Sequence, residues 1–232
     1  MTVRLKRKVI NFLLVQFGLR HLHGSLVQRL VRSLLDEVDM QHLKDSNASA
    51  TAFANRIEMY RFLATNVVGE EPIDFLEFGV FRGESIACWA TYHKHPQSRF
   101  FGFDSFEGLP EDWRTSQGKG HFSVDGATPQ ISDPRVQFIK GWFDSTVPAF
   151  VGSFVPRSRI VVHLDADLYA STLVPLIYLN GILARGTILI FDEFYDRDNE
   201  FKAFRDYLRV ARRSYRVLCH AAGYGQVCVE LD

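Results

Sequence analysis

The chain has 232 residues, which is long enough for one α/β domain with a large buried core. Its 27 basic and 27 acidic residues cancel, which argues against a protein that binds nucleic acid, because such a protein carries a basic excess. Three cysteines are too few and too irregularly spaced for a disulfide framework or a zinc site, so we expect reduced thiols in a cytoplasmic protein.

Residues 1–49 form the first predicted part of the chain, a helical extension with a basic start. The first 32 residues carry seven Lys or Arg and no Asp or Glu. The apolar run Val9–Val15 is too short to cross a bilayer, and no small-residue cleavage site follows it. Two interpretations stay open: a helix packed on the domain or in the seam of a homo-oligomer, which we expect, or a basic helix in peripheral contact with an anionic membrane.

Residues 50–232 form the second part, in which strands alternate with helices. Before Asp74 the chain is expected to be helical, over Leu5–Leu19, Leu26–Val38 and Ala50–Val67. After it, short apolar runs bounded by turn residues predict five parallel strands and then an antiparallel pair joined by a short turn. The five strands cover residues 75–81, 100–104, 136–140, 159–165 and 187–192, and the pair covers residues 216–220 and 226–230. This order predicts a Rossmann-like, seven-stranded and mostly parallel sheet with a C-terminal antiparallel hairpin.

Helix signals and one long loop lie between these strands. A helix is expected over Glu84–Tyr92, another with Ser171 or Thr172 as its cap, and another after Asn199 as its cap. The polar segment of residues 107–134 is too long for an ordinary connection and is therefore expected to be functional or mobile.

The first strand runs into the turn Glu77-Phe-Gly79-Val-Phe-Arg-Gly83-Glu-Ser85. Its two glycines allow the backbone to approach a ligand closely, and the following helix offers free amides. The GxxxG spacing differs from the GxGxxG of a nicotinamide-binding turn. Glu77 would repel a pyrophosphate but attract a cation. The turn therefore favours S-adenosylmethionine, which carries an ammonium and a sulfonium, over the nicotinamide cofactor of an oxidoreductase.

The second strand ends in an acidic residue, Asp104. A carboxylate at this position can accept hydrogen bonds from both hydroxyls of a ribose. Val80 and Ser85 in the glycine turn, and Ser105 after the second strand, complete the expected donor-binding set.

Acidic residues also end the fourth and fifth strands, namely Asp165, followed by Asp192 and Glu193. Because neighbouring parallel strands end at the same edge, these carboxylates are expected to converge, and their repulsion indicates a hard cation such as Mg²⁺. Asp167 is a competing ligand. Mg²⁺ would orient an acceptor hydroxyl and lower its pKa. Asp165, or second to it His163, is the expected base.

Four strings occur in this order: LEFGVFRGES, GFDSFEGLPE, HLDADLYAST and IFDEFY. Together they resemble the macrocin O-methyltransferase (TylF/MycF-like) family of class I S-adenosylmethionine-dependent methyltransferases, over about residues 50–232. The resemblance implies methylation of a sugar hydroxyl with Mg²⁺. It assigns donor binding to Glu77, Gly79, Gly83 and Asp104, and metal binding to Asp165, Asp192 and Glu193. The family often has two aspartates where this chain has Asp192 and Glu193.

The leading hypothesis is a Mg²⁺-assisted O-methyltransferase acting on a sugar, polyol or glycan-type small molecule. Two alternatives stay open. One is a catechol-type enzyme with a phenolic acceptor, which uses similar metal geometry. The other is a catalytically silent S-adenosylmethionine-binding protein, against which the intact set of carboxylates argues.

Overall fold

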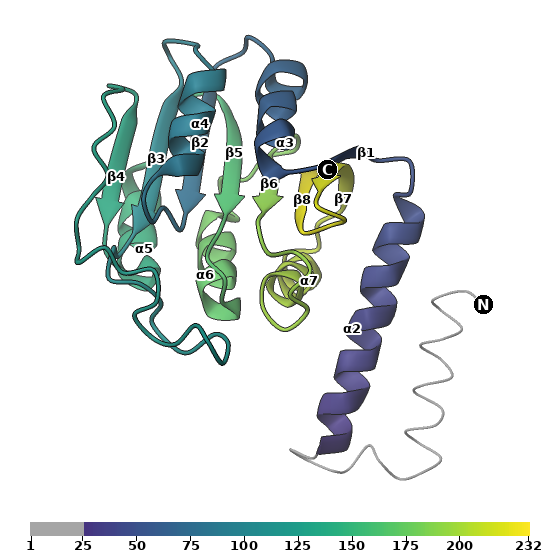
Figure 1. Cartoon of the computed structure of the whole chain (residues 1–232). Helices are drawn as coiled ribbons and strands as arrows, with labels where there is room; N and C mark the ends of the chain where they lie inside the picture. The colour runs from purple at the N-terminus through teal and green to yellow at the C-terminus, as the bar shows by residue number, and fades with distance from the viewer. Residues whose placement is uncertain (1–25) are drawn as a thin grey trace. The chain divides into compact units, whose positions relative to one another are not determined.

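The computed structural model describes residues 26–232, with side chains described from residue 36 (Figure 1). The chain divides into two compact units, residues 1–49 and 50–232. In the first unit, α2 spans Leu26–Ser46 and extends beyond the predicted end at Val38. It ends where the side chain of Asn47 donates to the carbonyl oxygen of Leu43 at 2.8 Å. The predicted helix over residues 5–19, and the side chains of the basic segment of residues 1–32, lie outside the described residues. None of the described helices is both long enough and apolar enough to cross a membrane.

The second unit is built on one eight-stranded sheet with the order β1-β7-β8-β6-β5-β2-β3-β4 (Figure 1). β8 is antiparallel to both of its neighbours, and the other pairs are parallel. The strands are β1 (Thr51–Phe53), β2 (Ile73–Phe78), β3 (Arg99–Asp104), β4 (Val136–Lys140), β5 (Arg159–Leu164), β6 (Ile188–Phe191), β7 (Tyr215–Ala221) and β8 (Gln226–Leu231). The predicted Rossmann-like sheet with its C-terminal antiparallel hairpin is confirmed, with one strand more than expected.

The additional strand, β1, lies where the sequence predicted the start of a helix at Ala50. Thr51–Phe53 pairs in parallel with β7, so it depends on the edge of a strand from the far end of the chain. The helix that follows, α3, begins only at Arg56. The side chain of Asn55 accepts a hydrogen bond from the Glu58 amide at 3.0 Å, which makes Asn55 the N-cap, and it donates one to the Glu58 carboxylate at 3.1 Å.

Two sets of helices cover the sheet. The first set is α3 (Arg56–Phe62), which continues as a π-helical segment, Leu63–Val68, and α4 (Glu84–Tyr92). The second is α5 (Phe143–Ser153), α6 (Tyr169–Leu179) and α7 (Glu200–Ala211). Contacts join neighbours within each set: α3 with α4, α5 with α6, and α6 with α7. The chain crosses outward through β2, β3 and β4 and returns through β5 and β6, so right-handed crossovers place the sets on opposite faces.

The starts of α6 and α7 are tied together at the carboxyl ends of the strands. α6 begins at Tyr169, so Ser171 and Thr172 lie inside its first turn and do not cap it as predicted. Asn199 does precede α7, but its side-chain oxygen accepts from the amide of Tyr169 at 2.9 Å instead of capping its own helix. This hydrogen bond joins the starts of α6 and α7 beside the end of the sheet where the predicted site residues lie.

Candidate active site

The glycine turn after β2 passes directly over the end of β5. Gly79 has φ +91°, and a Cβ atom on it would lie 1.7 Å from the carbonyl oxygen of Asp165. Its amide donates to the carbonyl of Phe103 at 3.0 Å. No side chain fits between the turn and β5, so glycine is required here, and the backbone of the turn is exposed to the neighbouring space.

Asp104 at the end of β3 holds this turn through three backbone amides. One carboxylate oxygen accepts from Val80 at 2.8 Å and from Phe81 at 2.9 Å, and the other accepts from Phe106 at 2.7 Å. A carboxylate has about four acceptor positions, so about one remains for a ligand. The role predicted for Asp104 toward a ribose therefore stays a prediction, and its positioning of the glycine turn is an additional role.

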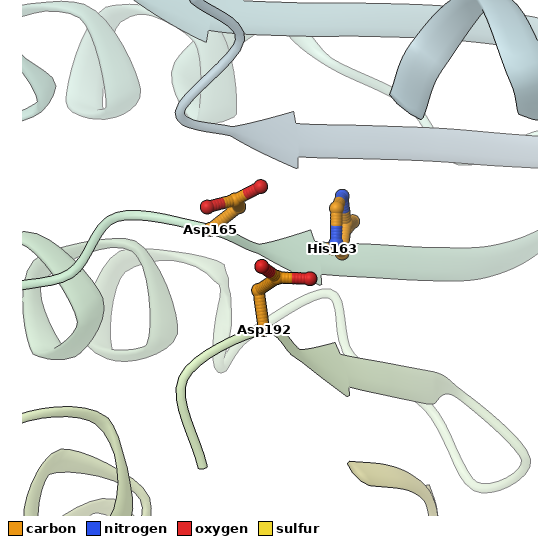
Figure 2. Close-up of side chains that lie close together, drawn as sticks. All are labelled: His163, Asp165 and Asp192. Carbon is orange, nitrogen blue, oxygen red and sulfur yellow. The ribbon is translucent and has the colours of Figure 1, made fainter. Parts of the chain in front are cut away.

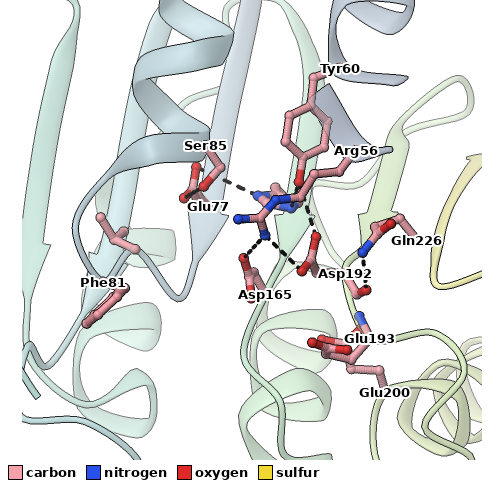
Figure 3. A network of polar contacts seen from close by, with 12 residues as sticks. Arg56, Tyr60, Glu77, Phe81, Ser85, Asp165, Asp192, Glu193, Glu200 and Gln226 are labelled. Atoms are coloured by element: carbon pink, nitrogen blue, oxygen red, sulfur yellow. Dashed lines mark hydrogen bonds and ion pairs between the residues drawn. The ribbon is translucent and has the colours of Figure 1, made fainter. Parts of the chain in front are cut away.

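Glu77 lies beneath the turn and is completely buried. One of its oxygens accepts from the hydroxyl of Ser85 at 2.5 Å. The other lies 3.7 Å from Nδ1 of His163, which is equally buried (Figure 3). Within the described part of the chain neither of these two facing atoms has a hydrogen-bond partner. A buried carboxyl group thus lies close behind the turn, and one of its oxygens accepts no hydrogen bond from the described residues.

The predicted carboxylates converge in part. Ligand atoms of His163, Asp165 and Asp192 lie within 4.8 Å of one another at the ends of β5 and β6 (Figure 2). Glu193, the third predicted metal ligand, is not in this group, although it lines the same cavity. His163 differs from the two carboxylates because it does not line this cavity; it is completely buried, and its Nε2 lies 3.0 Å from the hydroxyl of Tyr60.

Two side chains of α3 hold Asp192, one on each oxygen. Arg56 donates to Oδ2 at 3.0 Å, and the hydroxyl of Tyr60 donates to Oδ1 at 3.2 Å (Figure 3). The same nitrogen of Arg56 lies 3.6 Å from Asp165. Residues four apart on a helix lie on the same face, so one turn of α3 supplies both contacts.

The carboxylates raise one another's pKa values. Burial, with the charges of Asp192 and Asp167, raises the pKa of Asp165 well above its ordinary value. Burial, with the charges of Glu193 and Asp192, raises the pKa of Asp167 to about 7. Burial and the charge of Asp192 also raise the pKa of Glu193. This edge of the sheet therefore carries more negative charge than its described cationic neighbours balance.

The backbone around Asp192 is held from behind by two further side chains. The buried Glu200 accepts from the amide of Glu193 at 2.8 Å, and the side chain of Gln226 donates to the carbonyl of Asp192 at 3.1 Å (Figure 3). These bonds fix the turn between β6 and α7, so the carboxylate of Asp192 is presented from a rigid backbone.

A cavity of about 650 Å³ joins the glycine turn to the carboxylates. This volume is in the range of small-molecule sites. The predicted site residues that line it are Gly79, Val80, Asp104, Ser105, Asp165, Asp192 and Glu193. Those that do not line it are Glu77, Gly83, Ser85 and His163. The first group can touch a ligand in this cavity, and the second supports it from beneath.

Strained backbone and the long loop complete the cavity wall. Phe81, Phe122 and Asp167 line the cavity with φ values of +51°, +67° and +60°. Residues other than glycine rarely adopt such φ values, and the exceptions are commonly found at functional sites. Phe122 belongs to the predicted long loop, and its ring packs against Phe81 with centroids 5.5 Å apart.

The long loop is also fastened to the turn after β6. Trp113 Nε1 donates to Asp196 at 3.0 Å, and Arg114 donates to Asp196 at 3.3 Å and to the hydroxyl of Tyr195 at 3.0 Å. The loop therefore spans from the glycine turn to the carboxylates.

Comparison with known proteins identifies the family of this chain. Residues 44–215, more than half of the chain, match the family described as macrocin-O-methyltransferase (TylF). The chain belongs to this family. The resemblance drawn from the four sequence strings is thereby confirmed.

Two curated relatives of this chain are named as O-methyltransferases. The Streptomyces olivaceus 8-demethyl-8-(2,3-dimethoxy-alpha-L-rhamnosyl)-tetracenomycin-C 4'-O-methyltransferase is 30% identical over 60% of this chain and 60% of its own length. Demethyldecarbamoylnovobiocin O-methyltransferase of Streptomyces niveus is 26% identical over 64% of this chain and 63% of its own length. The chain thus spans less than two thirds of each relative.

Solved structures share the fold. The O-methyltransferase NovP has a TM-score of 0.60 at 21% identity, covering 75% of this chain and 78% of its own. The calicheamicin methyltransferase CalS11 has a TM-score of 0.55 at 21% identity, covering 93% and 90%. These similarities confirm a Rossmann-like methyltransferase fold for the TylF-family chain.

Sequence reasoning did not find Arg56, Tyr60, Glu200 or Gln226. The spacing of Arg56 and Tyr60 places them on one helix face, and the N-cap Asn55 marks where that helix starts. Neither signal indicates which strand end the helix faces. Glu200 resembles an ordinary acidic residue in the first turn of a helix, and nothing local distinguishes Gln226.

Proposed function

We propose that this chain is an S-adenosylmethionine-dependent O-methyltransferase that acts on a hydroxyl of a sugar or glycan-type small molecule. The observation that carries the proposal is one cavity whose wall contains the glycine turn and Asp104 together with Asp165 and Asp192. The turn suits the methyl donor, and the carboxylates suit an acceptor hydroxyl. Family membership, and the rhamnosyl substrate in the name of one relative, support the same conclusion.

The donor is proposed to bind along the exposed backbone of the glycine turn. Gly79, Val80, Asp104 and Ser105 line the cavity there. The buried charge of Glu77 lies behind the same backbone and would attract the cationic part of the donor without contacting it. In-line transfer then requires the acceptor oxygen about 3–3.5 Å from the methyl carbon, so a fixed turn and fixed carboxylates in the same cavity wall favour the reaction.

The residues fit a divalent cation such as Mg²⁺. Asp165 and Asp192 offer hard oxygen donors, and the raised pKa values of Asp165 and Glu193 indicate carboxylates in need of positive charge. Mg²⁺ is commonly held by one or two carboxylates with water completing its shell, so Asp165 and Asp192 suffice and Glu193 stays a predicted ligand. When bound, the cation would lower the pKa of the acceptor hydroxyl.

A carboxylate in the cavity is proposed to accept the acceptor's proton. Asp165 lines the cavity and its side chain is 26% exposed, which suits a base that meets substrate. Asp167 lines the same wall and is the alternative acceptor. His163, our second candidate from the sequence, is buried and faces Tyr60, so we propose that it supports Asp192 through that hydroxyl.

The test is incubation of the full chain with labelled S-adenosylmethionine, Mg²⁺ and three acceptor sets: nucleotide sugars, glycolipids and phenols. Label on a sugar hydroxyl is the expected result. Label on phenols alone would replace the acceptor with a catechol-type one. Donor binding by calorimetry without transfer to any set would indicate a silent binding protein, and binding of NADH in its place would overturn the proposal.

Contact of the basic segment with an anionic membrane, and assembly into a homo-oligomer, are proposals that rest on the sequence. Co-sedimentation with anionic vesicles and analytical ultracentrifugation, on the full chain and on residues 50–232, separate the two. Loss of pelleting on truncation supports membrane contact, and a change from dimer to monomer supports a seam.

A further inference from the structure

The guanidinium of Arg56 lies beside the two carboxylates of Asp165 and Asp192, here called the carboxylate pair. Its Nη1 lies 3.0 Å from Oδ2 of Asp192 and 3.6 Å from Oδ2 of Asp165 (Figure 3). Among the ion pairs of residues 36–232, those made by these two aspartates are both with Arg56. One positive charge thus faces two carboxylates, which leaves the pair incompletely neutralised.

The two α3 contacts to Asp192 differ in how firmly they are held. Tyr60 is completely buried, and its hydroxyl contacts both His163 and Asp192, so it cannot leave without emptying a packed site. The side chain of Arg56 is 36% exposed and lines the cavity. Tyr60 is therefore a fixed donor to Oδ1, whereas the guanidinium on Oδ2 can move into open space.

We propose that Arg56 is an exchangeable counter-ion, which neutralises Asp165 and Asp192 in the metal-free protein and is displaced when a divalent cation binds. The proposal rests on the metal site of the proposed function. A divalent cation held by Asp165 and Asp192 would meet the same two carboxylates as the guanidinium, and two cations at contact distance repel strongly in a partly buried site. The divalent ion replaces one charge by two against two carboxylates, and so it completes the neutralisation.

Exchange has a measurable consequence, because binding of the metal must break the contacts of Arg56. Removing the guanidinium should therefore tighten metal binding, whereas a residue that supports a metal site would weaken it when removed. The sign of the change thus separates a displaced counter-ion from a supporting neighbour.

The experiment is calorimetric titration of the full chain with Mg²⁺, and with Mn²⁺ as a second probe. Arg56→Met keeps the apolar stem and removes the charge, and Arg56→Lys keeps the charge. Arg61→Met is the matched control, since Arg61 is an exposed arginine of the same helix whose guanidinium lies over the ring of Tyr92. We expect Arg56→Met to bind the cation about tenfold more tightly than wild type. Arg56→Lys and Arg61→Met should stay within about twofold of wild type.

Thermal unfolding supplies an independent readout. Without added metal, Arg56→Met should melt below wild type because the carboxylates lose their counter-ion. In millimolar Mg²⁺ the difference should shrink or reverse, since tighter binding stabilises the folded state more. A second variant, Arg56→Gln, guards against a local effect of the Met side chain and should behave in the same way.

Two outcomes overturn the inference, and they are distinguishable. If wild type binds Mg²⁺ and Arg56→Met binds it equally or more weakly, Arg56 is not displaced, while the proposed metal site stands. If wild type binds neither cation at millimolar concentration, the metal part of the proposed function fails, and the exchange fails with it.

Discussion

Acidic residues at the amino ends of the parallel strands, here called the amino edge, serve a different purpose from those at the carboxyl ends, the carboxyl edge. At the amino edge, Asp74 is completely buried and fully bonded: Arg99 donates twice, at 2.7 and 2.9 Å, and the amides of Arg157 and Ser158 donate at 2.8 and 3.2 Å. Three of these four bonds end on Oδ2 and one on Oδ1, so the protein engages both oxygens. An acid arranged in this way stabilises the fold and is not presented to a ligand.

At the carboxyl edge, the acids outnumber their partners. Asp165, Asp167, Asp192 and Glu193 line one cavity, and the pKa values of three of them are raised by burial and by one another. Unlike Asp74, these groups line a cavity and have acceptor positions that a ligand can satisfy. The same side-chain chemistry thus serves stability at one edge and is held available for binding and proton transfer at the other.

The largest expected effect concerns stability at the amino edge. Asp74→Ala should lower the free energy of unfolding by about 3–5 kcal/mol, because it leaves Arg99 and two amides without their partner. Urea unfolding measures the loss, and methyl transfer per folded molecule should be unchanged. A loss below about 1 kcal/mol would mean that the amino-edge acid is not the structural element inferred here.

The second effect is on activity at the carboxyl edge. Asp192→Asn should lower kcat by about a hundredfold or more, the size of effect seen when a preorganised electrostatic group is removed. Its unfolding free energy should change by less than about 1 kcal/mol, because relief of carboxylate repulsion offsets the weakened contact with Arg56. Asp198→Asn, an exposed acid in the same turn, is the control. Wild-type turnover of Asp192→Asn, or of the wild type in excess chelator, would contradict the proposed metal site.

Asp104 is intermediate between the two edges, because it is a carboxyl-edge acid that backbone amides largely satisfy. Asp104→Ala should weaken binding of S-adenosylhomocysteine by roughly 1.5–3 kcal/mol, since it removes a charged acceptor and releases the amides of Val80 and Phe81. Calorimetry measures the change, with Glu107→Ala as an exposed control from the same loop. Unchanged affinity would show that neither the acid nor the shape of the turn matters to the donor.

The smallest expected effect is on stability, and it tests the contrast between a lowered carboxyl pKa at the amino edge and raised pKa values at the carboxyl edge. Asp133, just before β4 at the amino edge, has a lowered pKa because the side chain of Arg135 donates to it. A carboxyl group whose pKa is lowered by folding stabilises the protein at pH values above its ordinary pKa. This contribution to stability is lost as the pH falls through the pKa of the folded state. The pair should contribute at most about 1 kcal/mol at neutral pH. Melting temperatures of wild type and Asp133→Asn should therefore differ at pH 7 and converge below about pH 4, and a constant difference would be evidence against the pair.

The sequence by itself determined the order of the βα units, the glycine turn and the acids at the strand ends. Each of these depends on short-range patterns: an apolar run of five or six residues, a GxxxG turn, or an acid directly after a buried strand. Topology then requires the acids to share one edge, so the sequence alone predicts that Asp104, Asp165 and Asp192 lie at the same end of the sheet.

Only the tertiary structure decided which partners each of these groups meets. β1 forms because β7 offers an edge, Asp104 meets amides of a turn from another strand, and Arg56 meets Asp192 from 136 positions away. The local pattern around Glu193 likewise does not reveal that it lies outside the close group of His163, Asp165 and Asp192. Such contacts depend on where packing places one helix or turn against a distant strand end, and no short-range periodicity encodes that distance.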